Sequence, residues 1–197
     1  MISAWAGKVE INMEQGRQLI GYLTVDSHEN YFRGAALVTD SRGIPSDFRY
    51  TEPVRPTRLE RILYGSALDI YLKEDIILDN LISAVETKPT LWLLENEELI
   101  APVQKLSRVP AIAVEVSARS PMEQSGQCEP TGEEGVFMLQ ADNISAPLRL
   151  TLSLDNAPKI TQFARMLTAS AEEMELMEPF SRVARALEAI LESESKQ

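Results

Sequence analysis

The sequence predicts an α+β fold, with a largely antiparallel sheet of about eight or nine strands, a helical pair at about 57–87 and a helical region at about 157–192. Three observations carry this prediction. Short alternating apolar segments fill residues 1–54 and 91–154. Apolar residues recur at helical spacing in the other two regions. With 44% apolar residues and no apolar run near the roughly 18 that span a bilayer, the chain has the content of a globular core.

Four strand-like segments come first along the chain. In Lys8–Glu14, apolar Val9, Ile11 and Met13 alternate with polar residues, which is the period of a half-buried strand. The loop at 40–46 is rich in turn residues, so the segments on either side of it form a hairpin. The predicted antiparallel strands are 8–14, 19–26, 31–39 and 47–54.

A helix is predicted directly after Pro56. Thr57 and Glu60 have the spacing of a capping box, in which each side chain bonds the other residue's backbone N–H. A second helix is predicted from about Asp75 to Glu86. In the first helix the apolar residues recur about every 3.6 positions and predict one buried face: Leu59, Ile62, Leu63, Ala67, Ile70 and Tyr71.

The middle of the chain returns to strands. Segments 91–95 and 99–103 flank Asn96-Glu97-Glu98 and are interpreted as a short hairpin, followed by strands at 111–117, 135–141 and 147–154. Residues 118–134 contain almost no large apolar side chain, which predicts a flexible exposed loop. We therefore expect a core at 1–117, this loop at 118–134, and 135–197 packed on the same core.

The last region is predicted to be helical, starting near Pro158 and interrupted at Pro179. Beyond Pro179 the apolar residues form a narrow stripe with charged residues around it, which predicts a helix covering the sheet or offered to a partner. The residues of this stripe are Phe180, Val183, Ala184, Leu187, Ile190 and Leu191.

Arginines are concentrated in one stretch of an acidic chain. Six arginines and four acidic residues give residues 33–61 a net charge of +2, whereas the whole chain carries −11. Arginine without lysine favours bidentate recognition of carboxylate or phosphate. The alternative is pairing with acidic residues of the chain itself. The predicted partner-binding residues are Arg42, Arg49, Arg55, Arg58 and Arg61.

Candidate catalytic residues are few. Asp26, Asp40 and Glu95 each fall at the end of a predicted strand, and this arrangement resembles that of ribonuclease H-like nucleases, which gather carboxylates around divalent metal. Aspartate is also common where a strand enters a turn. His28 is the only histidine, and its neighbours Asp26 and Ser27 are too close in sequence to form a triad. The prediction is therefore no catalytic residue, no metal ligand and no cofactor.

These observations favour a non-catalytic subunit or adaptor of a cytoplasmic, multi-protein assembly, of a bacterial type, that contacts an acidic or phosphate-bearing protein partner. A single cysteine, Cys128, fits a reducing compartment, and no signal peptide or membrane segment is expected. Two alternatives stay open: a metal-dependent nuclease or phosphodiesterase, and a nucleic-acid-binding accessory protein. The net charge of −11 disfavours nucleic acid.

Overall fold

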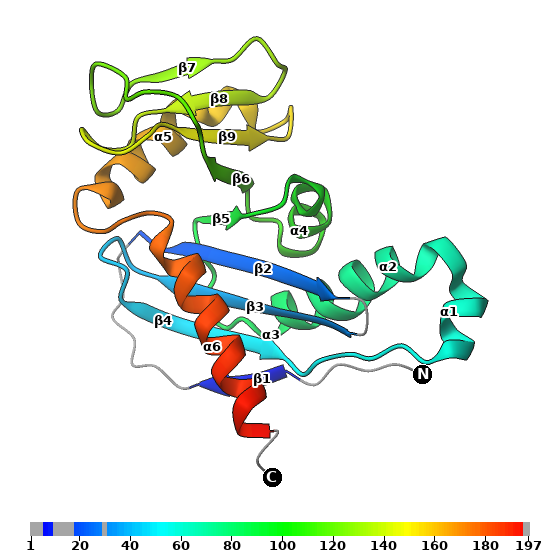
Figure 1. Cartoon of the computed structure of the whole chain (residues 1–197). Coiled ribbons are helices and arrows are strands. Elements are labelled where there is room, and N and C mark those ends of the chain that lie inside the picture. The colour runs from blue at the N-terminus through cyan, green and yellow to red at the C-terminus, as the bar shows by residue number, and fades with distance from the viewer. Residues whose placement is uncertain (1–5, 10–17, 29–30, 195–197) are drawn as a thin grey trace.

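The computed structural model describes residues 6–9, 18–28 and 31–194. Its strands are β1 (Ala6–Val9), β2 (Ile20–His28), β3 (Tyr31–Thr39), β4 (Pro45–Thr51), β5 (Leu91–Leu94), β6 (Ala111–Val116), β7 (Cys128–Pro130), β8 (Val136–Leu139) and β9 (Leu148–Leu152). Together they form a nine-stranded sheet in the order β1-β4-β3-β2-β5-β6-β9-β8-β7 (Figure 1). The part of the predicted first strand beyond Val9 lies outside the described residues.

Most neighbouring strands in this sheet are antiparallel, which confirms the predicted α+β class. The exceptions are β2 with β5 and β5 with β6, which are parallel. The predicted hairpin at 91–103 is wrong, because the chain after β5 turns through a 3-10 helix, η3 (Glu97–Leu99), into helix α4 (Ile100–Ser107). Leu99, Ile100 and Val103 are buried at helical spacing, and this crossover makes β6 parallel to β5.

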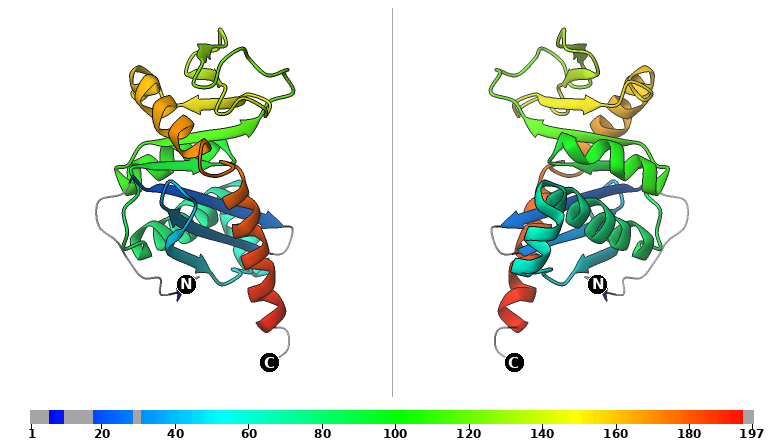
Figure 2. Two further views of the ribbon diagram at one scale, coloured as in Figure 1. Left: turned by 90° about the vertical axis from the view of Figure 1, so that its left-hand side faces the viewer. Right: turned by 90° about the vertical axis from the view of Figure 1, so that its right-hand side faces the viewer.

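Helices cover both faces of the sheet. The remaining elements are α1 (Arg58–Tyr64), η1 (Gly65–Ala67), α2 (Leu68–Ile70), the π-helix η2 (Tyr71–Leu78), α3 (Asp79–Ala84), η4 (Ala157–Lys159), α5 (Ile160–Ala171) and α6 (Glu178–Glu194). Helices α5 and α6 lie on one face, and η2, α3 and α4 lie on the other (Figure 2). On the second face Gly34 lets η2 approach β3, because a Cβ there would lie 2.6 Å from Ile77.

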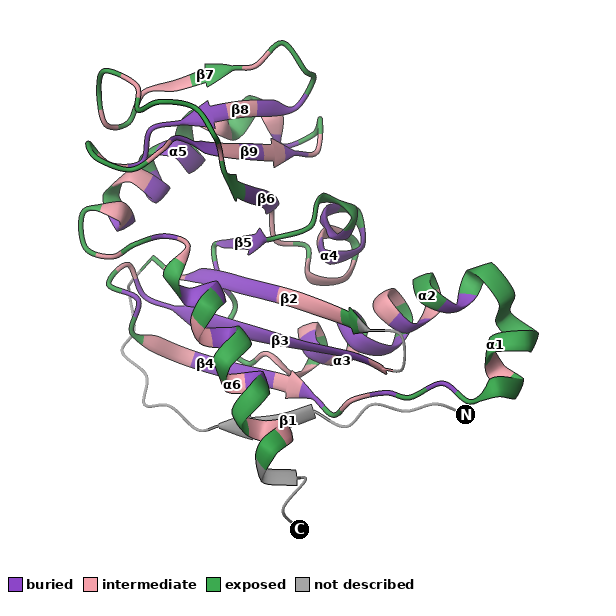
Figure 3. Cartoon of the chain, viewed as in Figure 1, coloured by how far each residue is buried: buried purple, intermediate pink, exposed green. Residues whose placement is uncertain are grey.

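Helix α1 departs from the predicted burial. Its capping box forms as expected, with Thr57 and Glu60 bonded to each other's backbone N–H. However, this described helix has no buried residue, and Leu59, Ile62 and Leu63 are 64%, 68% and 71% exposed (Figure 3). Gly65, at φ 53°, ends α1, so the buried positions fall further along the chain: Leu68, Leu72, Ile76, Ile77, Leu78 and Leu81.

Residues 118–134 are tied to the sheet through Gln140. The side chain of Gln140 is 1% exposed and accepts the Met122 N–H at 2.7 Å, while its backbone exchanges hydrogen bonds with Gly126 and Gln127. The segment also supplies β7, which pairs with β8. None of the described helices combines the length and apolar character that crossing a membrane requires.

Candidate functional site

The parallel pairing of β2 and β5 brings polar residues together at the carboxyl ends of these strands. Leu23 lies opposite Leu94, so the next residues, Thr24 and Glu95, are neighbours. The Thr24 hydroxyl donates a 3.0 Å hydrogen bond to a Glu95 carboxylate oxygen. Thr24 is partly buried and Glu95 is exposed, so the carboxyl end of β5 is open to solvent.

Asp26 lies two residues further along β2, on the same face as Thr24. Its carboxylate receives two hydrogen bonds from Arg33 on β3, from Nε at 3.1 Å and from Nη2 at 3.0 Å. Arg33 is 7% exposed, and its Nη1 donates to the Leu187 carbonyl of α6 at 3.1 Å. Asp26 and Glu95 therefore lie toward the carboxyl ends of adjacent strands, and each carboxylate already accepts a hydrogen bond.

Asp40, the third carboxylate at a predicted strand end, lies at the opposite end of β3 from Arg33. Asp26 pairs with Arg33, whereas Asp40 follows the far end of β3, so roughly 20 Å of strand separates them. Asp40 accepts the backbone N–H groups of Arg42 and Ile44 at 2.9 Å and 3.0 Å. Burial opposes ionisation, but these bonds and the Arg42 guanidinium outweigh it, so the pKa of Asp40 lies below its ordinary value. Asp40 organises the β3–β4 turn.

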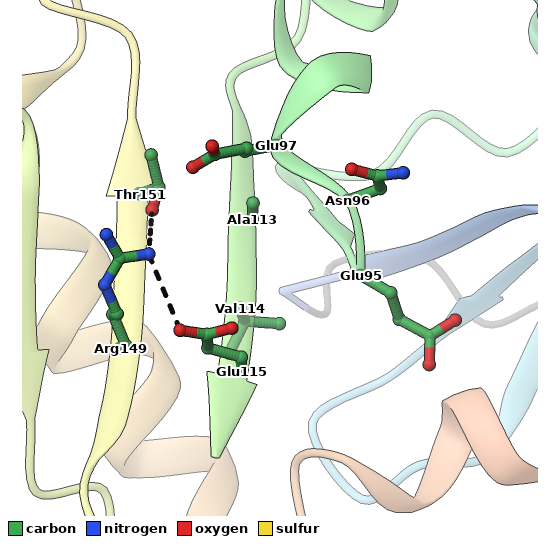
Figure 4. Close-up of a pocket in the computed structure, with 8 residues that line it drawn as sticks. All are labelled: Glu95, Asn96, Glu97, Ala113, Val114, Glu115, Arg149 and Thr151. Carbon is green, nitrogen blue, oxygen red and sulfur yellow. Dashed lines mark hydrogen bonds and ion pairs between the residues drawn. The ribbon is translucent and has the colours of Figure 1, made fainter. Parts of the chain in front are cut away.

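A hollow of about 210 Å³ adjoins Glu95 on the other side of β5 (Figure 4). Glu115 and Arg149 form an ion pair across its wall at 3.5 Å, and Arg149 also bonds Thr151. In Figure 4 the carboxylate of Glu95 points away from this pair, whereas the carboxylate of Glu97 points toward Thr151. The carboxylates that line the hollow do not converge on a common point.

Enzymes that cleave phosphodiesters commonly hold two divalent cations between clustered carboxylates. Within the described residues, no group of three or more aspartate, glutamate, histidine or cysteine side chains could hold a metal ion. Asp26 is hydrogen-bonded by Arg33, and Glu95 by Thr24. The site therefore does not fit a metal centre of this kind.

The five predicted partner-binding arginines do not form one surface. Arg49 is 3% exposed and pairs with Asp47 at 3.1 Å and with Glu86 at 3.3 Å, so it is unavailable to a partner. It joins β4 to the end of α3, where Asp47 also accepts the backbone N–H of Glu86. Arg42 lies in the β3–β4 turn, paired with Asp40, at the opposite end of these strands from α1.

The other three arginines share the end of the sheet where β2 finishes. Val54 bridges to Phe32 at the start of β3, so Arg55 lies beside Tyr31, with its guanidinium 5.9 Å from the ring centre. Arg58 and Arg61 follow on α1, and all three are exposed. We call Arg55, Arg58 and Arg61 the arginine end. Lys73 of η2 bonds Glu98 at 2.7 Å, which ties this helical region to the residues after Glu95.

Sequence reasoning missed Thr24, Lys73 and the pairing role of Arg33. The Asp26–Arg33 pair had a readable signal: a two-residue connection at 29–30 places His28 opposite Tyr31 and hence Asp26 opposite Arg33. The contacts of Thr24 and Lys73 depend on the crossover after β5, which the pattern did not reveal. His28 lies at the end of β2.

Solved structures of endonuclease V have a similar fold. An endonuclease V from Streptomyces avermitilis aligns with a TM-score of 0.57 and 16% identity, over 93% of this chain and 88% of that one. Human endonuclease V aligns with a TM-score of 0.52 and 13% identity, over 95% and 93%. At these identities the likeness shows the fold. No protein-family model matches the sequence, and no curated protein matches it either.

These comparisons overturn the expected class of partner. The sequence favoured an accessory subunit that meets another protein, with nucleic acid disfavoured by net charge. The endonuclease V proteins from Streptomyces avermitilis and human, which share this fold over nearly its whole length, are nucleases instead. The net charge of −11 is an average over the whole chain, whereas the arginine end is locally basic. The prediction of an accessory subunit with a protein partner is therefore wrong.

Proposed function

We propose that this protein binds nucleic acid, with the arginine end contacting the phosphate backbone. The observation that carries this proposal is the exposure of Arg55, Arg58 and Arg61 at the end of the sheet where β2 finishes, in a fold shared with endonuclease V. A guanidinium matches phosphate bidentately and stays charged at every relevant pH. Three of the five arginines predicted to bind a partner thus contact nucleic acid in this proposal.

The apolar side chains of α1 favour nucleic acid with unpaired bases. Leu59, Ile62 and Leu63 are exposed on the same helix as Arg58 and Arg61, and this helix has no buried residue. Tyr64, which is 40% exposed, stacks on Tyr71 with ring centres 4.8 Å apart. Unpaired bases present apolar faces that pack on such side chains, whereas a duplex hides them.

Fluorescence anisotropy with a labelled oligonucleotide tests this proposal. A single strand of mixed sequence, titrated in EDTA, is expected to bind more tightly than the matching duplex. Because about three arginines contact phosphates, the logarithm of affinity should fall with the logarithm of salt concentration with a slope of about −2. The same affinity for the duplex would contradict the role given to unpaired bases.

A pair of double mutants locates the surface. Arg58→Glu with Arg61→Glu should lose binding by about tenfold or more, since each removes a bidentate phosphate contact. The matched control is Arg119→Glu with Arg165→Glu, which reverses two exposed arginines in the loop after β6 and in α5. Equal loss in both pairs would indicate that only total charge matters and would reject the arginine end as a site.

A further inference from the structure

We infer that Arg33 and Thr24 take the place of a divalent cation at the carboxyl ends of β2 and β5, so that nucleic acid bound here is not cleaved by a metal-dependent route. This inference rests on the proposed nucleic-acid binding. It concerns a different property, however. That property is whether the carboxyl ends of β2 and β5 bind a divalent cation, not which surface holds the nucleic acid. Two contacts support it: Arg33 with Asp26, and Thr24 with Glu95.

Moving Arg33 away from Asp26 would also break other contacts of the Arg33 side chain. Its guanidinium is buried at the β3–α6 junction, lies 5.6 Å from the centre of the Tyr31 ring, and satisfies the Leu187 carbonyl. Turning the side chain away would remove the Arg33 donor from that carbonyl and both Arg33 hydrogen bonds from the Asp26 carboxylate. A divalent cation on Asp26 would also stand next to this fixed positive charge. The sheet thus holds Asp26 as the counter-ion of an arginine.

Thr24 occupies a position where a two-carboxylate metal centre would need a second carboxylate. The register of β2 and β5 places it against Glu95, where a second carboxylate would be needed to share a cation. The side chain present is a hydroxyl, and it donates a hydrogen bond to Glu95. Glu95 therefore has a hydrogen-bond donor at the position where a paired site needs another anionic oxygen.

The test measures cation binding without nucleic acid, so it does not depend on whether the arginine end binds an oligonucleotide. Isothermal titration calorimetry with Mn²⁺ alone is applied to the wild-type chain and to Thr24→Asp, which installs a carboxylate against Glu95. The double variant Thr24→Asp with Glu95→Gln is the matched control. Thr24→Asn reports the cost of changing the side chain without adding charge, and thermal unfolding of each variant checks that it is folded.

The wild-type chain is expected to show no saturable uptake of Mn²⁺ at millimolar concentration. Folded Thr24→Asp should gain one saturable site, and adding Glu95→Gln should weaken that site by about tenfold or more. Saturable Mn²⁺ binding by the wild-type chain that Asp26→Asn or Glu95→Gln abolishes would overturn the inference. So would Mn²⁺-dependent cleavage of an oligonucleotide by the wild-type chain that is lost in the same variants, or a folded Thr24→Asp that gains no site.

Discussion

Helices α1 and α6 both carry an apolar stripe at helical spacing, yet only α6 buries it. Val183 and Leu187 of α6 are 1% and 3% exposed, and they pack into the core over β2 and β3. The corresponding residues of α1, Ile62 and Leu63, are 68% and 71% exposed (Figure 3). The same sequence pattern thus has two outcomes in one chain.

The difference follows from what each helix can reach. α6 crosses the sheet, where Phe180 meets the Tyr22 ring at 5.2 Å and the Leu187 carbonyl receives Arg33. α1 projects beyond the ends of β3 and β4, and Gly65 ends it before the chain returns to the sheet (Figure 1). The stripe of α6 stabilises the fold, whereas the stripe of α1 stays exposed.

The largest effect on stability is expected from truncating the buried stripe. Leu187→Ala should lower the free energy of unfolding by about 3 kcal/mol, because it removes a buried side chain and leaves a cavity. Urea denaturation followed by circular dichroism measures this change. A loss as small as that of an exposed residue would show that α6 is not held by its apolar stripe.

A second prediction concerns the polar anchor of α6. Arg33→Met should cost about 2–3 kcal/mol, because it removes the Arg33 hydrogen bonds to Asp26 and to the Leu187 carbonyl while keeping much of the side chain's volume. The cost stays below that of a fully buried pair because the Asp26 side chain is 32% exposed. Adding Asp26→Asn should recover part of the loss by removing the charge that Arg33 balances. Additive losses in the double mutant would contradict the pairing.

Smaller effects are expected on α1. Leu63→Ala should change the free energy of unfolding by no more than about 0.5 kcal/mol, because the side chain makes no buried contact and alanine is a good helix former. The same variant should weaken binding of a single-stranded oligonucleotide. Denaturation and anisotropy on one preparation separate these properties. A loss comparable to that of Leu187→Ala would mean that α1 packs on the protein.

The spacing of apolar residues predicted which segments form helices and strands better than it predicted how those helices and strands pack. The capping box at Thr57 and the alternation of β9 depend on neighbouring residues, so both were readable. The burial of α1 depends on where Gly65 turns the chain, and the crossover after β5 depends on packing between distant segments. Asp26 and Glu95 were recognised as candidates, but their hydrogen bonds with Arg33 and Thr24 depend on the sheet register.

The most direct test of nucleic-acid binding at the arginine end is the affinity of the Arg58→Glu, Arg61→Glu double mutant for a single-stranded oligonucleotide, measured by anisotropy in EDTA. The account predicts a melting temperature close to that of the wild-type chain, since both side chains are exposed, together with a loss of affinity of about tenfold or more. A folded double mutant that binds as tightly as the wild-type chain would contradict it.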